Sequence, residues 1–221
     1  MSYPSIKDKD FYKKLNNKFT SYIIPRKRKT FNQICFPKEF QLQIPQKFLS
    51  KYINPKSPYK GVLVFHRIGA GKTCTAVRIG EQWKKHRRII VVTPASLKGN
   101  FRDELRSFCA KNSYITDGER KKLKKYHPAS YEYKDIIRTT NKRIDKVYRI
   151  YSYNKFVDLA TEGEISFHNS VLIVDEVQNM VSEKGVFYDT LYNAIQYAPN
   201  SLRVILLSAT PMFDKPVEIA L

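Results

Sequence analysis

Long apolar runs are missing from this 221-residue sequence, which has nothing close to the roughly eighteen consecutive apolar residues of a membrane span. Its first ten residues are polar and charged, so they do not form the apolar core of a secretory signal peptide. Hydrophobic residues make up 42% of the chain and aromatic residues 13%, which is enough to bury a core. We therefore expect a soluble, intracellular, folded protein with no membrane partner.

Cysteine is also scarce. The three cysteines, Cys35, Cys74 and Cys109, are odd in number and lie far apart along the chain. Neither a disulfide framework nor the closely spaced ligands of a zinc site can be recognised in this spacing. We expect reduced thiols that pack mostly as small apolar groups.

Acidic residues are few in the first two thirds of the chain. Residues 1–149 carry 36 Lys and Arg against 11 Asp and Glu, whereas residues 150–221 carry 4 against 9. Such asymmetry is typical of proteins that bind polyanions, because each neutralised phosphate releases condensed counterions. Lysines that only keep the protein soluble would give the same composition, so both interpretations stay open.

Two segments hold much of the basic excess. Residues 1–39 are expected to be a basic N-terminal extension, of which 1–32 show no sustained period and are interpreted as an extended arm. Residues 111–146 contain the run Arg120–Lys125 but no clear strand, and we expect a basic insertion there. The insertion would interrupt a single lobe formed by residues 40–221.

Apolar runs alternate with helical stretches in this lobe, which is typical of an α/β fold with a mostly parallel sheet and helices on both faces. A short amphipathic helix is expected near Pro45, with Ile44, Phe48 and Tyr52 on one side. The expected strands are Val62–His66, Ile89–Thr93, Val147–Ser152, Val171–Asp175 and Val204–Ser208. The expected core faces of two more helices are Leu97, Phe101, Leu105 and Phe108, and Phe187, Leu191, Ala194, Ile195 and Ala198.

The first of these strands runs into a glycine-rich turn and then a helix, the order that a phosphate cradle needs. Glycines let consecutive backbone N–H groups point inward, and the N-terminus of the helix adds its positive end. Lys72 is expected to reach the β- and γ-phosphates and Thr73 to ligate Mg²⁺. The expected ATP-binding residues of this turn are Arg67, Ile68, Gly69, Ala70, Gly71, Lys72, Thr73 and Cys74.

The match to a P-loop has one departure, since His66 stands where the general pattern has glycine. A chance Gly-Lys-Thr sequence in a strand-to-helix turn is the alternative interpretation. The strand before the turn and the helix after it favour the phosphate site.

A second buried strand ends in two adjacent carboxylates. Asp175 is expected to hold Mg²⁺, and Glu176 to orient and deprotonate the water that attacks the γ-phosphate. Acidic pairs after buried strands are otherwise common as helix caps. Because this pair follows a phosphate loop by about a hundred residues, we interpret Lys72 and Glu176 as the catalytic residues.

Several segments together resemble superfamily 2 helicases. The phosphate loop, Asp175–Gln178 and Ser208–Thr210 are similar to motifs I, II and III. Val92–Phe101 resembles motif Ia, and Ile150–Phe156 the region of motif Ib, in the Swi/Snf-type branch. The loop itself looks most like that of large-DNA-virus ATPases related to poxvirus nucleoside triphosphate phosphohydrolase I and the early transcription factor. The resemblance covers roughly residues 40–215 and implies a RecA-like P-loop lobe.

The resemblance also implies roles for residues outside the phosphate loop. Ile44–Leu49 looks like the glutamine motif, which implies that Gln46 contacts the adenine of ATP. Gln178 replaces the usual histidine of the DExH pattern, and an amide can still bridge by hydrogen bonds. The residues expected to couple the ATP site to nucleic acid are Gln178, Ser208 and Thr210. Contacts to nucleic-acid phosphates are expected from Thr93, Pro94, Lys98 and Asn100, although Thr93-Pro94 is equally typical of a helix start.

The implied cofactors are ATP and Mg²⁺, and the implied partner is nucleic acid, with DNA favoured over RNA. Motifs IV to VI, with the arginine that completes the ATP site, are absent from residues 1–221. A second RecA-like lobe is therefore expected in cis or in trans, and the isolated lobe should be weakly active or inactive. For a viral protein the implied location is the host cytoplasm, in the viral factory, or the virion.

We therefore expect the ATP-binding lobe of a nucleic-acid-dependent ATPase that acts as a helicase or translocase. A P-loop kinase of small molecules would explain the phosphate loop but not the acidic pair together with Ser208–Thr210. A catalytically silent nucleic-acid-binding module that keeps the fold of the lobe is the other alternative. ATP hydrolysis by the chain, with and without nucleic acid, distinguishes these classes.

Overall fold

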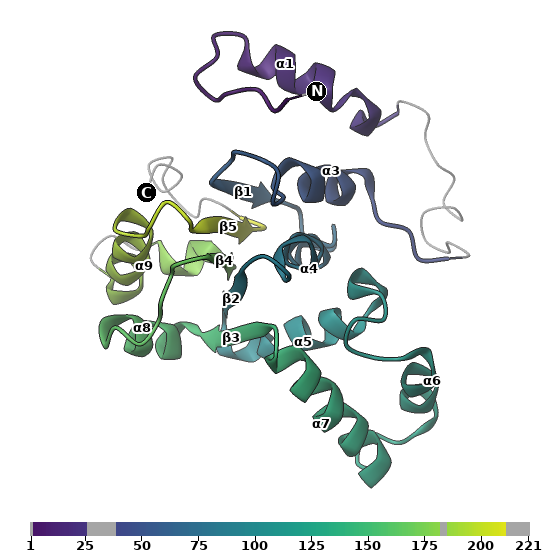
Figure 1. The fold of residues 1–221 in the computed structure, drawn as a ribbon. Coiled ribbons are helices and arrows are strands. Elements are labelled where there is room, and N and C mark those ends of the chain that lie inside the picture. Colours follow the sequence, from purple (N-terminus) through teal and green to yellow (C-terminus); the bar gives the residue numbers. More distant parts are fainter. Residues whose placement is uncertain (1, 26–38, 182–184, 211–221) are drawn as a thin grey trace.

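A computed structural model describes residues 2–25, 39–181 and 185–210 of the chain. These residues contain a five-stranded parallel sheet with the strand order β1-β5-β4-β2-β3 (Figure 1). The strands are β1 (Gly61–Phe65), β2 (Arg88–Thr93), β3 (Tyr148–Ser152), β4 (Ser170–Asp175) and β5 (Arg203–Ser208). All five predicted strands are confirmed, each within one residue at either end.

Helices cover both faces of the sheet, as predicted (Figure 1). The helices on one face are α3 (Ile44–Tyr52), α4 (Lys72–Trp83), α5 (Lys98–Arg106) and α7 (Tyr131–Asp145). The helices on the other face are α8 (Tyr153–Thr161) and α9 (Val186–Gln196). No helix within the described ranges is long and apolar enough to cross a membrane.

The apolar side chains of the central strands pack into two hydrophobic cores, one on each face of the sheet. In β2, Ile89 and Val91 pack in the core under α4, whereas Ile90 and Val92 pack in the core under α8. Successive side chains of a strand point to opposite faces, so a strand with helices on both sides is apolar throughout. This is why the strands could be located so closely from the sequence.

One predicted helix face ends earlier than expected. Phe101 and Leu105 are buried, but Phe108 is 54% exposed, so the prediction that it is a core residue is wrong. Helix α5 ends at Arg106, and Phe108 begins the separate 3-10 helix η3 (Phe108–Ala110). The break in the helix turns the Phe108 ring outward. By contrast, the predicted face of α9 does pack in its core.

The N-terminal segment folds onto the lobe instead of extending from it. Residues 2–25 contain α1 (Phe11–Lys18) and η1 (Thr20–Tyr22), so the interpretation as an extended arm is wrong for them. Phe19 is buried and meets the ring of Phe48 in α3 edge-on, with 5.1 Å between the centroids. Aromatic residues among the lysines supply this packing. Most of the basic run at residues 25–30, and Cys35, lie outside the described residues.

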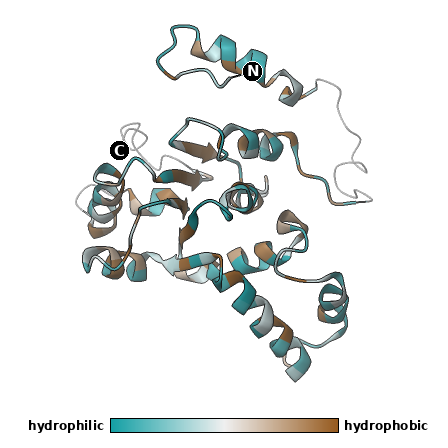
Figure 2. Cartoon of the chain, in the orientation of Figure 1, coloured by the Kyte–Doolittle hydropathy of each residue, from teal (hydrophilic) through white to brown (hydrophobic). Residues whose placement is uncertain are grey.

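The predicted insertion at residues 111–146 is helical and consists mainly of α6 (Asp117–Lys125) and α7. Its lack of strands is confirmed. An ion pair joins the two helices, with Arg143 Nη1 2.8 Å from Glu119 Oε2. Ile144 at the end of α7 is fully buried, so this part belongs to the core of the lobe. Both helices are hydrophilic along much of their length (Figure 2).

The expectation of reduced cysteines is wrong for two of the three. Cys74 in α4 and Cys109 in η3 form a disulfide, with their Cα atoms 5.5 Å apart in space and the two residues 35 positions apart in the sequence. The chain between them runs through β2 and α5 and returns to the first turn of α4. Sequence spacing gave no sign of this pairing, because only the fold brings η3 against α4.

Candidate nucleotide site

The predicted site residues gather at the carboxyl edge of the sheet. The phosphate loop follows β1, the acidic pair follows β4, and Ser208 ends β5. Parallel pairing aligns these ends, since Phe65 lies beside Ser208 and Asp175 beside Leu207. In open α/β sheets, ligands bind outside the carboxyl ends of the strands.

The phosphate loop has the backbone that its glycines permit. Gly69 and Gly71 have φ angles of 79° and 74°, a left-handed conformation that glycine adopts without steric cost. The N–H group of Ala70 donates to the carbonyl oxygen of Arg67 at 3.0 Å, and α4 starts at Lys72. The loop therefore leads directly into the N-terminus of a helix, where backbone N–H groups are free to bind an anion.

His66 fits the loop although the general pattern has glycine there. Its φ angle is not positive, so a side chain is tolerated without strain. Its N–H group donates to the carbonyl oxygen of Ser208 at 3.1 Å and joins the loop to the end of β5. Burial, assisted by the charge of Lys72, lowers the pKa of the imidazole, so His66 is neutral at neutral pH.

Gln46 is buried and supports the phosphate loop. Its Nε2 donates to the carbonyl oxygen of Gly71 at 3.1 Å, and its Oε1 accepts from the N–H group of Gln43 at 2.8 Å. A side chain on Gly71 would collide with this amide. Gln46 therefore positions the loop, a role that the sequence did not suggest, and its contact to adenine stays a prediction.

Lys72 joins the phosphate loop to the acidic pair. Its ammonium group contacts the Glu176 carboxylate and lies 3.3 Å from Asp175 Oδ1. Burial raises the pKa of Asp175, which is only 4% exposed, and Lys72 opposes that rise. Burial also disfavours the charged form of Glu176, but hydrogen bonds from Lys72 and Gln178 outweigh it and lower the pKa of Glu176. Glu176 is therefore a carboxylate at neutral pH.

The backbone of the acidic pair is held in an unusual conformation. Glu176 has a φ angle of 54°, which is uncommon for a residue with a side chain. The hydroxyl oxygen of Tyr153 lies 2.6 Å from the carbonyl oxygen of Asp175 and 2.8 Å from that of Glu176. Tyr153 thereby stabilises the turn that aims both carboxylates. In the sequence, this tyrosine was marked only as part of Ile150–Phe156, the segment that resembles the region of motif Ib.

The three predicted coupling residues lie near the acidic pair, and two of them, Ser208 and Thr210, are joined by a hydrogen bond. Gln178 Nε2 donates to Glu176 Oε2 at 2.7 Å. The Oγ of buried Ser208 accepts from the N–H group of Thr210 at 3.0 Å. Gln178 therefore contacts Glu176 directly. The coupling of all three residues to nucleic acid stays a prediction.

The predicted nucleic-acid residues differ in exposure. Thr93 is fully buried at the end of β2, and its hydroxyl has no hydrogen-bond partner within the described part of the chain. The structure therefore does not support a direct contact from Thr93. Pro94 and Lys98 are partly exposed and Asn100 is exposed, so these three are accessible.

A cavity of about 310 Å³ lies at the phosphate loop. Its walls include the loop and Lys72, Thr73 and Glu176. Cys74, Glu104 and Ala209 also line it. Glu104 comes from α5, 32 positions after Lys72, and no sequence motif marked it.

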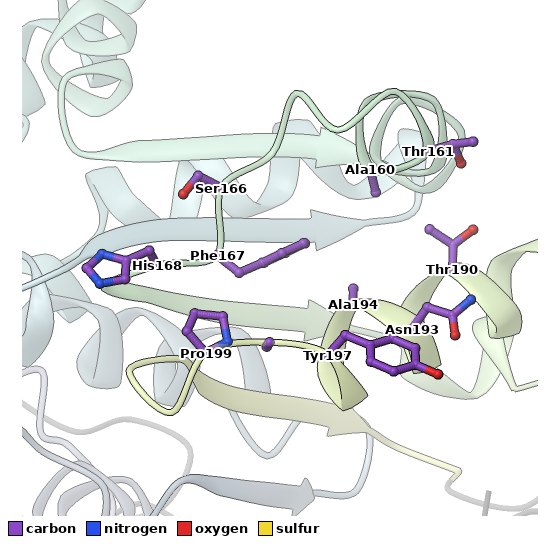
Figure 3. A pocket seen from close by; sticks show the side chains of 11 residues that line it. Ala160, Thr161, Ser166, Phe167, His168, Thr190, Asn193, Ala194, Tyr197 and Pro199 are labelled. Atoms are coloured by element: carbon purple, nitrogen blue, oxygen red, sulfur yellow. The ribbon is translucent and has the colours of Figure 1, made fainter.

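A larger cavity of about 530 Å³ lies elsewhere, between α8, α9 and the segment before β4 (Figure 3). Phe167, His168 and Tyr197 are among the residues that line it. It contains none of the predicted site residues and lies beside the amino end of β4, away from the acidic pair. A third cavity, of about 700 Å³, lies beside Phe40 and Phe108, so size alone does not select the cavity at the phosphate loop.

The parallel sheet, the phosphate loop and the acidic pair at its edge define a RecA-like nucleotide-binding lobe. Residues 44–219 match the DEAD/DEAH box helicase family, and the chain belongs to that family. The fold is similar to that of the Hef helicase domain of Pyrococcus furiosus, with a TM-score of 0.50 and 18% identity, over 86% of this chain and 36% of the other. The predicted fold is confirmed.

The similar sequences include several viral proteins. Over its whole length the chain is 56% identical to a protein of Acanthamoeba polyphaga mimivirus named as ATP-dependent RNA helicase R563, and it spans 39% of that protein. It is 30% identical over 228 residues to the helicase 087L of Invertebrate iridescent virus 3, covering 92% of this chain and 21% of the relative. An NPH-I termination factor homolog of African swine fever virus is 25% identical over 168 residues, covering 72% of this chain and 21% of the relative.

Proposed function

We propose that this chain is the ATP-binding lobe of a nucleic-acid-dependent ATPase that couples ATP hydrolysis to movement along DNA or RNA. The observation that carries the proposal is the contact of Lys72 with the carboxylates of Glu176 and Asp175 beside the cavity of the phosphate loop. A cation in a glycine-rich loop and two carboxylates across from it are the groups that phosphoryl transfer requires.

The residues present suit Mg·ATP. The carboxylate of Asp175 and the hydroxyl of Thr73 are hard oxygen ligands, which Mg²⁺ prefers. The left-handed glycines leave no side chain between the loop backbone and an incoming phosphate. Mg²⁺ bound there would supply charge neutralisation for the phosphates.

Within this arrangement Lys72 has two alternative sets of partners. It pairs with the acidic residues in the structure, and phosphates would compete for its ammonium group. Movement of Lys72 toward phosphate would release Glu176 from its ion pair. The carboxylate, already ionised at neutral pH, would then be free to accept a proton from water.

The partner is proposed to be nucleic acid contacted mainly through phosphates, by the accessible residues Pro94, Lys98 and Asn100 and by the basic helix α6. We favour DNA, and the RNA helicase name of the mimivirus relative makes RNA the necessary comparison. Because the chain spans 39% of that relative, we propose that a second lobe completes the ATP site. Residues 1–221 alone should then hydrolyse ATP slowly.

Two substitutions test the nucleotide site. Lys72→Ala should abolish binding of a fluorescent ATP analogue, with the circular dichroism spectrum unchanged, because Lys72 packs in no core. Glu176→Gln should keep Mg·ATP binding and remove whatever hydrolysis the parent shows, since an amide cannot accept the proton of water. The exposed Lys85→Ala is the matched control.

Equal ATP affinity in Lys72→Ala and the parent would overturn the proposal. If the parent binds DNA or RNA but no nucleotide, the catalytically silent nucleic-acid-binding module is correct instead. Phosphate transfer to a small molecule, without stimulation by nucleic acid, would favour the kinase alternative.

A further inference from the structure

The disulfide lies at the wall of the candidate ATP site. Cys74 directly follows Thr73 in the first turn of α4, and it lines the cavity of the phosphate loop. Cys109 is behind it in η3, and the two residues are 5% and 1% exposed. Of the two cysteines, Cys74 is the one that lines the cavity. A small thiol that enters the cavity can therefore reach Cys74.

Glu104 links the disulfide to the cavity. Its Oε1 lies 2.7 Å from the Sγ of Cys109, and the same residue lines the cavity. A disulfide sulfur has no hydrogen to donate, so a hydrogen bond at this contact requires the proton to be on the carboxyl group. Burial raises the pKa of Glu104, which agrees with a protonated acid there.

We propose that Cys74 and Cys109 are a reversible thiol–disulfide site that a dithiol reduces through the nucleotide cavity, and that its reduction weakens ATP binding. This inference rests on the proposed function of the cavity as an ATP site.

The chemistry balances with a dithiol as the only co-reactant. One of its thiols loses a proton to solvent, and the thiolate attacks the sulfur of Cys74 and breaks the Cys74–Cys109 bond. Cys109 leaves as a thiolate and takes the proton of Glu104. The second thiol of the reductant then attacks the mixed disulfide and transfers its proton to Cys74. Two electrons pass from the dithiol, which leaves as a disulfide.

Reduction changes the charge that the cavity presents to phosphates. The Cys109 thiol can donate to Glu104, so the carboxyl group is stabilised as an anion instead of an acid. An anion in the wall of the cavity repels the phosphates of ATP. If reduction weakens ATP binding by some factor, bound ATP must shift the thiol–disulfide equilibrium toward the disulfide by the same factor. Bound nucleotide also fills the cavity and so blocks access of the dithiol to Cys74.

The test uses residues 1–221 with Cys35→Ser, so that only the pair can react. A fluorescent ATP analogue is titrated with the oxidised protein and with protein reduced by dithiothreitol. We expect about tenfold weaker binding after reduction, within the usual range of coupling between two sites. The rate of reduction, followed by alkylation and mass spectrometry, should fall when the Mg²⁺ complex of a non-hydrolysable ATP analogue is present.

Two variants separate the proposed mechanism from a general loss of structure. Glu104→Gln should bind the analogue with the same affinity before and after reduction, because an amide is neutral in both states. The double variant Cys74→Ser and Cys109→Ser should not respond to dithiothreitol. The comparison of oxidised and reduced parent protein holds even if the double variant does not fold.

The outcomes are distinct. Equal affinities in the two redox states, or reduction at the same rate with and without nucleotide, would overturn the inference and leave the ATP site intact. Stoichiometric Zn²⁺ on the isolated protein, held by the two thiolates and Glu104, would also overturn it. If neither redox state binds the analogue, the proposed function fails instead.

Discussion

The side-chain amide of Gln46 donates a hydrogen bond to the carbonyl oxygen of Gly71 at 3.1 Å. This bond joins α3 to the last residue of the phosphate loop, and the other end of the amide caps α3 through Gln43. A residue expected to contact adenine is therefore also part of the framework of the loop. Its replacement should affect stability as well as nucleotide binding.

We expect Gln46→Leu to lower the free energy of unfolding by about 1–3 kcal/mol, because it removes a buried partner from two backbone groups. ATP affinity should fall at the same time, as the loop loses its support. Chemical denaturation and titration with a fluorescent ATP analogue measure the two effects, with the exposed Gln41→Leu as control. Weaker affinity at unchanged stability would show that contact with the nucleotide is the main role.

Substitution of Phe19 tests whether the N-terminal segment packs against the lobe. Phe19→Ala should lower the free energy of unfolding by about 3 kcal/mol, because a buried aromatic ring leaves a cavity when it is removed. Tyr12 in the same segment is 78% exposed, so Tyr12→Ala should change stability by no more than about 0.5 kcal/mol. Equal, small effects of both substitutions would mean that the segment does not pack in solution.

The ion pair between Glu119 and Arg143 should make the stability of the α6–α7 pair depend on pH. The hydrogen bond from Arg143, opposed by burial, lowers the pKa of Glu119 below its ordinary value of 4.5. A lowered carboxyl pKa stabilises the folded state above that ordinary value, and the contribution is lost as pH falls through the lowered pKa.

A double-mutant cycle with Glu119→Gln and Arg143→Gln measures this contribution by chemical denaturation. Because Arg143 is partly exposed, we expect a coupling of about 1 kcal/mol or less at neutral pH. It should disappear below the lowered pKa. A coupling that persists in acid would mean that packing, and not charge, joins the two side chains.

Helix α6 should contribute to nucleic-acid binding through its lysines. All four lysines of the helix are exposed and make no ion pair in the part of the chain that the structure describes: Lys121, Lys122, Lys124 and Lys125. Replacing them with Gln should lower the slope of log affinity against log salt by about 0.7–0.9 for each phosphate that is no longer neutralised. Fluorescence anisotropy with single-stranded DNA, duplex DNA and RNA measures the slope.

The control replaces four exposed lysines elsewhere with Gln: Lys47, Lys51, Lys56 and Lys85. It removes the same charge without touching α6, so it corrects for the general effect of net charge. An equal decrease of the slope in both variants would indicate that the lysines of α6 only keep the protein soluble.

The sequence alone determined the sheet, the phosphate loop and the acidic pair. Strands buried on both faces leave continuous apolar runs, as in Val171–Asp175, and glycines mark left-handed positions such as Gly69 and Gly71. These determinants act over a few neighbouring residues. They can be recognised before the fold is known, and the order of the motifs along the chain then indicates which ends of the strands meet.

Only the tertiary structure decided which distant side chains complete the site. Tyr153 holds the turn after Asp175, Glu104 enters the wall of the cavity, and Cys109 reaches Cys74 across 35 positions. Each contact depends on how α5, η3 and α8 pack against the sheet. Their local sequence indicates a helix or a buried residue but does not specify a partner, because the packing of elements far apart in the chain determines which side chains meet.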